Sequence, residues 1–150
     1  MVITKSVNKS CSLLSSLVVY FSFLSAAAVA FAANCNTPVY LRFGKKAMPH
    51  LQETGTEKFE FGKGRVITEG TDIAIIACGE TVAPAVEAAK KLAIQNIQAT
   101  VISMHTIKPL DTNLLATVAK TCKAVITIEE HSVYGGLGEA CGSYLLQHGI

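Results

Sequence analysis

The sequence predicts an α/β fold, a three-layer α/β/α sandwich of Rossmann-like type around a mostly parallel sheet. Three short runs rich in apolar residues, at 73–78, 98–104 and 124–128, have the pattern of buried strands. A segment typical of a helix follows each of them. Strands that alternate with helices pair in parallel through right-handed crossovers, so the three repeats together define the fold class.

The first strand–helix unit covers residues 73–95. Its apolar run ends at Gly79, and apolar residues then recur three and four positions apart, which predicts an amphipathic helix over residues 81–95. Glu87 and Lys91 lie four residues apart on the solvent side of that helix, where opposite charges attract.

The second and third units repeat this order. The strand at 98–104 leads to a helix at 112–121, and Asp111 is placed to cap its first turn. The strand at 124–128 leads through a glycine-rich segment to a helix over 138–148.

The N-terminal part of the chain differs, because Lys5 and Lys9 are the only charges among its first 41 residues. The apolar run at 13–33 is long enough to cross a bilayer, and residues 30–32 have the A-x-A pattern of a cleavage site. A secretory signal or an uncleaved anchor fits this layout. A helix of a soluble protein, ended by the Asn- and Pro-containing segment 34–38, fits it too.

Between this part and the first unit, the pattern predicts extended structure. Residues 39–43 are β-branched and aromatic, which favours a strand, and 46–58 is a polar linker. Residues 59–61 and 65–68 then predict a β-hairpin around a Gly-Lys-Gly turn.

Composition narrows the class of protein. The length of 150 residues suits one domain, and a net charge of +2 gives no argument for nucleic-acid binding. The five cysteines include no C-x-x-C pair and no zinc-type Cys/His cluster, which indicates reduced thiols and no metal site.

Candidate functional residues are expected beyond the carboxyl ends of the strands, where open parallel sheets bind ligands. The loop at 129–138 is the richest of three such loops; the others cover 79–81 and 105–108. It contains the acid–base groups Glu129, Glu130 and His131 and the glycines Gly135, Gly136 and Gly138. Such glycines let backbone N–H groups bind an anion at a helix start. Their spacing departs from the dinucleotide fingerprint, which favours a domain-interface loop with tight turns. His105 and His131 are then structural.

Several motifs, in the same order along the chain, resemble the transketolase family. Residues 70–79 resemble the strand that opens its C-terminal domain, 107–111 its Ile-Lys-Pro-Leu-Asp motif, and 129–132 with 135–138 its Glu-Glu-His-Ser and Gly-Gly-Leu-Gly motifs. Residues 38–45 are similar to the segment that ends the preceding pyrimidine-binding domain. The sequences of these motifs are most similar to separately encoded C-terminal transketolase subunits. The resemblance covers about residues 26–150.

The resemblance implies four parts. These are a non-family apolar leader at 1–25, a remnant of the pyrimidine-binding domain at 26–46, a linker and β-hairpin at 47–70, and a C-terminal domain at 71–150 that is truncated, so that the sandwich is incomplete at its C-terminus.

The resemblance also implies a parent enzyme that uses thiamine diphosphate and a divalent metal to transfer ketol units between sugar phosphates. No residue here matches the family's cofactor-binding or catalytic groups. The chain alone is therefore expected to bind neither thiamine diphosphate nor the metal, and to be inactive. Lys45 stands where the family often has an arginine that contacts the substrate phosphate.

The implied partners are an N-terminal transketolase subunit or its domains and a second copy, in a cytoplasmic homodimer with the 129–138 loop at an interface. Two other functions remain open. One is a membrane-tethered or exported binding module, if residues 1–33 act as a signal or anchor. The other is a Rossmann-like binder of a nucleotide or anion at residues 135–138.

Overall fold

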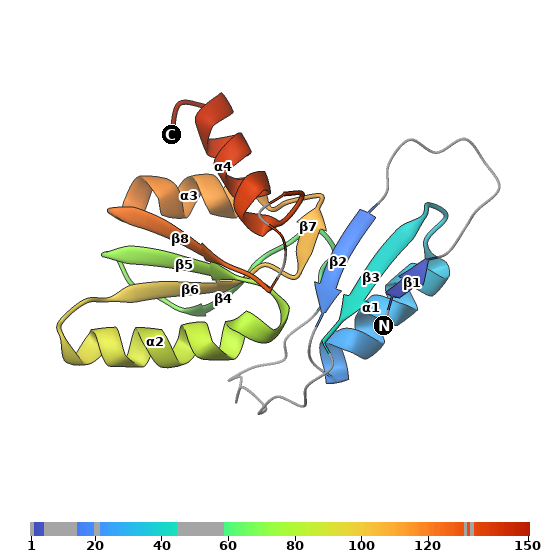
Figure 1. Ribbon diagram of the computed structural model, residues 1–150, viewed down its shortest axis with the longest axis horizontal. Coiled ribbons are helices and arrows are strands. Elements are labelled where there is room, and N and C mark those ends of the chain that lie inside the picture. The colour runs from blue at the N-terminus through green and yellow to red at the C-terminus, as the bar shows by residue number, and fades with distance from the viewer. Residues whose placement is uncertain (1, 5–14, 20–21, 45–58, 131, 133) are drawn as a thin grey trace.

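Two four-stranded sheets organise the chain (Figure 1). The computed structural model describes residues 2–4, 15–19, 22–44, 59–130, 132 and 134–150. Within these ranges, strands β4-β6-β5-β8 form what we call the central sheet, and β1-β3-β2-β7 form the N-terminal sheet.

The central sheet carries the predicted repeats. Its strands are β4 (Arg65–Thr68), β5 (Ile73–Ala77), β6 (Ala99–Ser103) and β8 (Ala124–Ile128). Strand β5 pairs in parallel with both β6 and β8, so that Ile73 is level with Ala99 and Ala124. Strand β4 is antiparallel to β6. The mostly parallel sheet is therefore confirmed.

Helices cover both faces of the central sheet, as Figure 1 shows. They are the short 3-10 turn η1 (Gly79–Thr81) and the helices α2 (Val82–Ile94), α3 (Thr112–Thr121) and α4 (Leu137–Gln147). Side chains of β5 alternate between the faces: Ile75 packs in the core under α2, and Ile76 in the core under α3 and α4. Asp111 caps α3 as predicted, since its Oδ1 accepts a hydrogen bond from Leu114 N at 3.2 Å.

The N-terminal sheet contains a strand–helix–strand unit. Its elements are β1 (Val2–Thr4), β2 (Ser15–Val19), α1 (Ser22–Asn34), β3 (Val39–Phe43) and β7 (Thr106–Lys108). Strands β2 and β3 are parallel and joined by α1. Strand β7, which lies between β6 and α3 in the sequence, pairs antiparallel with β2. Residues 15–19 and 22–25, expected within a non-family leader, thus supply β2 and the first turn of α1.

Helix α1 occupies the apolar run that allowed a membrane signal. Its Ala28 and Ala32 are buried in one core with Val39 and Leu41 of β3. No helix in the described ranges is both long enough and apolar enough to cross a bilayer. The helix ending at Asn34 and the strand at 39–43 are confirmed.

The predicted β-hairpin is wrong. Residues 59–64 form no strand, and β4 pairs with β6 instead of with that segment. Phe59 and Phe61 alternate because both contact Phe31 of α1, with ring centroids 6.1 and 4.3 Å away. The linker at 46–58 lies outside the described residues.

Candidate functional site

The 129–138 loop leaves the carboxyl end of β8 and leads into α4. Glu129 orders it, because its Oε2 accepts a hydrogen bond from Leu137 N at 2.8 Å and its Oε1 accepts one from Gly138 N at 2.9 Å. The first N–H groups of a helix have no partner within the helix, and negative charge is favourable there. Glu129 therefore caps α4 from a position eight residues before the first residue of the helix.

Glycine is favoured at each of three loop positions for a different physical reason. A β-carbon at Gly136 would overlap the Glu129 carboxylate, so only glycine leaves room for this cap. A β-carbon at Gly138 would lie 3.1 Å from Thr127 Oγ1. Gly135 has open space around it but a φ of +74°, a conformation that glycine adopts without strain.

A second carboxylate closes the loop. Glu139 Oε2 accepts a hydrogen bond from Gly135 N at 2.6 Å. Together, Glu129 and Glu139 occupy three backbone N–H groups, those of Gly135, Leu137 and Gly138. An external anion would have to displace these carboxylates and would be repelled by their negative charge. The geometry therefore opposes nucleotide or anion binding here.

Two thiols lie beneath the loop. Burial raises the pKa of Cys78, just after β5, to about 12; the charge of Glu129 adds to this rise, and that of Arg42 opposes it. Burial, with the charge of Glu129, also raises the pKa of Cys141 in α4 to about 12. Both thiols stay protonated at neutral pH, so neither is an activated nucleophile.

The loop after β5 is tied to the neighbouring strand end. Cys78 N donates to Ile128 O at 3.3 Å, and the Thr81 hydroxyl lies 2.8 Å from the carbonyl oxygens of both Cys78 and Ile128. The 79–81 turn therefore fixes the relative position of β5 and β8 at the edge where the 129–138 loop begins.

His105 lies between the two sheets, after β6 and just before β7. It is 3% exposed, its Nε2 lies 3.2 Å from Glu60 O, and its ring packs on Phe59 with centroids 5.2 Å apart. Burial lowers the pKa of His105, and the charge of Arg65 lowers it further, against the hydrogen bond to Glu60. A neutral, buried imidazole fits the predicted structural role.

Of the other predicted site residues, the structure describes Glu130 but not His131 or Lys45. The Glu130 side chain is exposed, while its carbonyl oxygen accepts a hydrogen bond from Arg42 Nη2 at 2.8 Å. His131 and Lys45 lie outside the described residues. Sequence reasoning missed Arg42. The available signal was alternation along β3, which directs Val39 and Leu41 into the core and a charged Arg42 to the other face.

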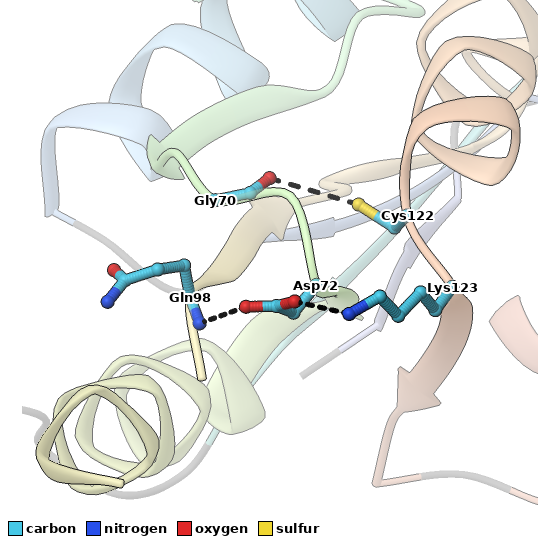
Figure 2. A network of polar contacts seen from close by, with 5 residues as sticks. All are labelled: Gly70, Asp72, Gln98, Cys122 and Lys123. Atoms are coloured by element: carbon cyan, nitrogen blue, oxygen red, sulfur yellow. Dashed lines mark hydrogen bonds and ion pairs between the residues drawn. The ribbon is translucent and has the colours of Figure 1, made fainter. Parts of the chain in front are cut away.

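A separate polar network joins the amino ends of the same strands (Figure 2). Asp72 accepts hydrogen bonds from Gln98 N and from Lys123 Nζ, each at 2.8 Å, and Lys123 N donates to Asp72 O. The bond from Lys123, followed by that from Gln98, lowers the pKa of Asp72. Cys122 Sγ lies 3.9 Å from Gly70 O. The network links β5, β6 and β8.

The described residues do not fit the metal of a thiamine diphosphate site. They contain no group of three His, Cys, Asp or Glu placed to hold an ion. Three of their carboxylates are already engaged: Glu129 by α4, Asp72 by Lys123, and Asp111 by the backbone of Gly64 and Leu114. Cys78, Cys122 and Cys141 are buried free thiols.

The fold and the loop define a class: a Rossmann-like domain with a carboxylate-capped loop at the carboxyl edge, joined to a strand–helix–strand unit. The family model described as "Transketolase, C-terminal domain" matches residues 62–150. The chain therefore belongs to the transketolase family and carries its C-terminal domain.

Relatives agree with this assignment. The chain is 44% identical over 101 residues to an apulose-4-phosphate transketolase subunit of Phocaeicola vulgatus, covering 67% of this chain and 32% of the relative. It is 38% identical over 125 residues to 1-deoxy-D-xylulose-5-phosphate synthase of Halothermothrix orenii, covering 79% and 19%. A solved structure described as "Split gene transketolase, inactive beta4 tetramer" matches with a TM-score of 0.83 and 40% identity, covering 89% of this chain and 44% of that one. The chain thus spans about a third of the transketolase subunit it matches.

Proposed function

We propose that this chain is the C-terminal part of a thiamine-diphosphate-dependent transketolase and serves assembly rather than catalysis. In this proposal it docks onto an N-terminal transketolase subunit or its domains, helps to form the homodimer of the complete enzyme, and transfers no ketol unit alone. The cofactor and its divalent metal are held by the partner.

One observation carries the proposal. On the inner side of the 129–138 loop, carboxylates occupy the N–H groups of Gly135, Leu137 and Gly138. The buried thiols of Cys78 and Cys141, outside the loop, stay protonated. Its outer side presents the Glu130, Ser132 and Tyr134 side chains, and Tyr134 is 83% exposed. An exposed aromatic side chain is typical of a protein–protein contact. The word "inactive" in the name of the related solved structure supports inactivity alone.

Lys45 is the substrate contact that we propose for the assembled enzyme. It follows Gly44 directly after β3 and would bind the substrate phosphate as a point charge. Exchange of Lys45 for Ala is expected to raise KM for a phosphorylated substrate with little change in kcat. Lys45→Arg, which keeps the positive charge, is expected to leave KM near that of the unaltered chain.

We place the enzyme in the cytoplasm. The support is that α1, which covers most of the signal-like run, packs Ala28 and Ala32 into the core under β3. Recovery of an unprocessed chain in the soluble fraction of cells would agree with this, and processing after residue 32 or membrane retention would contradict it.

The proposed function is tested by a ketol-transfer assay with thiamine diphosphate and Mg²⁺. The purified chain is assayed alone and after mixing with the N-terminal subunit of a split transketolase. We expect turnover only in the mixture. Turnover by the chain alone would contradict the proposal, as would a mixture that stays inactive and unassociated.

A further inference from the structure

We propose that Arg42 is a positioning residue that fixes the 129–138 loop to the N-terminal sheet, so that the loop surface is ordered only when β3 is in place. The effect on partner binding rests on the proposed function above. The effect on the loop itself does not.

The direction of Arg42 follows from its strand. Val39 and Leu41 of β3 are each 1% exposed and pack against α1. Alternation along a strand directs Arg42 to the opposite face. From there its Nη2 donates to Glu130 O at 2.8 Å, a contact between residues 88 positions apart in the sequence. The contact joins the N-terminal sheet to the loop that leaves the central sheet.

The acceptor of this bond lies at a sensitive place in the loop. Glu130 follows Glu129, whose carboxylate caps α4 through Leu137 and Gly138. A hydrogen bond to the Glu130 carbonyl fixes the peptide group at which the chain turns away from β8. The direction of the Glu129 side chain depends on that same turn.

Two local bonds hold described residues further along the loop. Tyr134 N donates to Ser132 Oγ, and Gly135 N to Glu139. These bonds stay within the loop or connect it to α4, which packs on the central sheet. Among the described residues of the loop, Glu130 is linked to the N-terminal sheet by the bond from Arg42.

Electrostatics favours the same arrangement. The charges of Arg42 and Glu129 act on the pKa of the Cys78 thiol in opposite directions. The guanidinium of Arg42 thus counters the effect of the Glu129 carboxylate on that thiol. Its planar fork fixes geometry in a way that an ammonium group does not.

The test compares Arg42→Gln and Arg42→Lys with Lys91→Gln, a control that removes an exposed cation from the solvent side of α2. Hydrogen exchange is measured on the full chain for the amides of 134–138 and of α2. For Arg42→Gln we expect about tenfold faster exchange in the loop, as loss of a hydrogen bond from a charged donor implies. Arg42→Lys should show a smaller increase, and Lys91→Gln none.

Unchanged loop exchange in both Arg42 variants would overturn the proposal. An equal rise in the loop and in α2 would overturn it too, because that pattern indicates a purely global loss of stability. Should Arg42→Gln not fold, the same comparison is made with Arg42→Lys, in which a positive charge remains.

A binding titration adds a second readout. For Arg42→Gln, affinity for the N-terminal subunit should fall about tenfold, while the control keeps the affinity of the unaltered chain. Failure of the unaltered chain to bind contradicts the proposed function, and the exchange result still decides the role of Arg42.

Discussion

Two carboxylates organise opposite ends of the central sheet, and they do so differently. Asp72, at the amino end of β5, joins three strands, with the exposed cation of Lys123 as its counter-charge. Glu129, after β8, has backbone N–H groups of α4 as its partners, and the loop it orders projects outward. At the amino ends of the strands the carboxylate holds the strands together, whereas at the carboxyl ends it orders a loop that is exposed on the surface.

Removal of the Glu129 carboxylate gives the largest expected effect. Glu129→Ala leaves the N–H groups of Leu137 and Gly138 without their acceptor and should lower the free energy of unfolding by about 2–3 kcal/mol, measured by urea denaturation. Glu130→Ala, which alters an exposed side chain at the neighbouring position, is the control and should change it by less than about 0.5 kcal/mol. Equal effects would contradict the capping role.

Glycine substitutions sharpen the comparison of the two ends. A β-carbon at Gly70 would overlap the backbone of Gln98, which cannot move away easily, so Gly70→Ala should cost about 2 kcal/mol or more. At Gly136 the obstacle is the Glu129 side chain, which can rotate at the expense of its hydrogen bonds, so a smaller loss is expected.

Gly142→Ala is the matched control for these substitutions. It lies in α4 with open space around it and should raise the free energy of unfolding by about 0.5–1 kcal/mol. A stabilising effect of Gly70→Ala or Gly136→Ala in the same denaturation series would contradict the close approaches described above.

The region between the sheets should respond to mild acid through His105. Because its pKa is lowered in the folded chain, only the unfolded chain binds a proton as the pH falls below the ordinary value of 6.5. Stability should decline there by up to about 1.4 kcal/mol per pH unit until the folded-state pKa is reached. Denaturation between pH 7 and pH 5 tests this, and His105→Gln should flatten the profile; an unaltered slope would exclude His105 as its source.

The Asp72–Lys123 pair should give the smallest effect, in a different pH range. The pKa of Asp72 is lowered, so its stabilising contribution is present above the ordinary value of 3.8 and is lost as the pH falls through the folded-state value. Because Lys123 is 81% exposed, Lys123→Gln should cost little at neutral pH, and less in 1 M NaCl. A melting experiment in low and high salt measures this, and a salt-independent loss would contradict an exposed ion pair.

Local pattern predicts the repeats of the central sheet. Strands β5 and β8 and the Asp111 cap all follow from residues near one another in the sequence. The helix within the signal-like run is only one of two alternatives, because apolar helices look alike in a bilayer and in a protein core. Burial of Ala28 under β3 distinguishes them, and that contact is made in three dimensions.

Long-range pairing accounts for what the local pattern misses. The alternation of Phe59 and Phe61 suggests a hairpin, yet both rings serve a core shared with α1. Strand β7 joins β2 across most of the chain, and Arg42 meets Glu130 across 88 residues. In the loop, the glycines stand out in the sequence, but the reason for Gly136 is its close approach to a carboxylate from the end of β8.

The most direct test of the assembly role is a titration of a fixed amount of N-terminal transketolase subunit with this chain, read as cofactor-dependent ketol transfer. We predict no turnover from either component without its partner, and activity that rises with added chain until the subunits are matched. Turnover by this chain in the absence of the N-terminal subunit would contradict the assembly role.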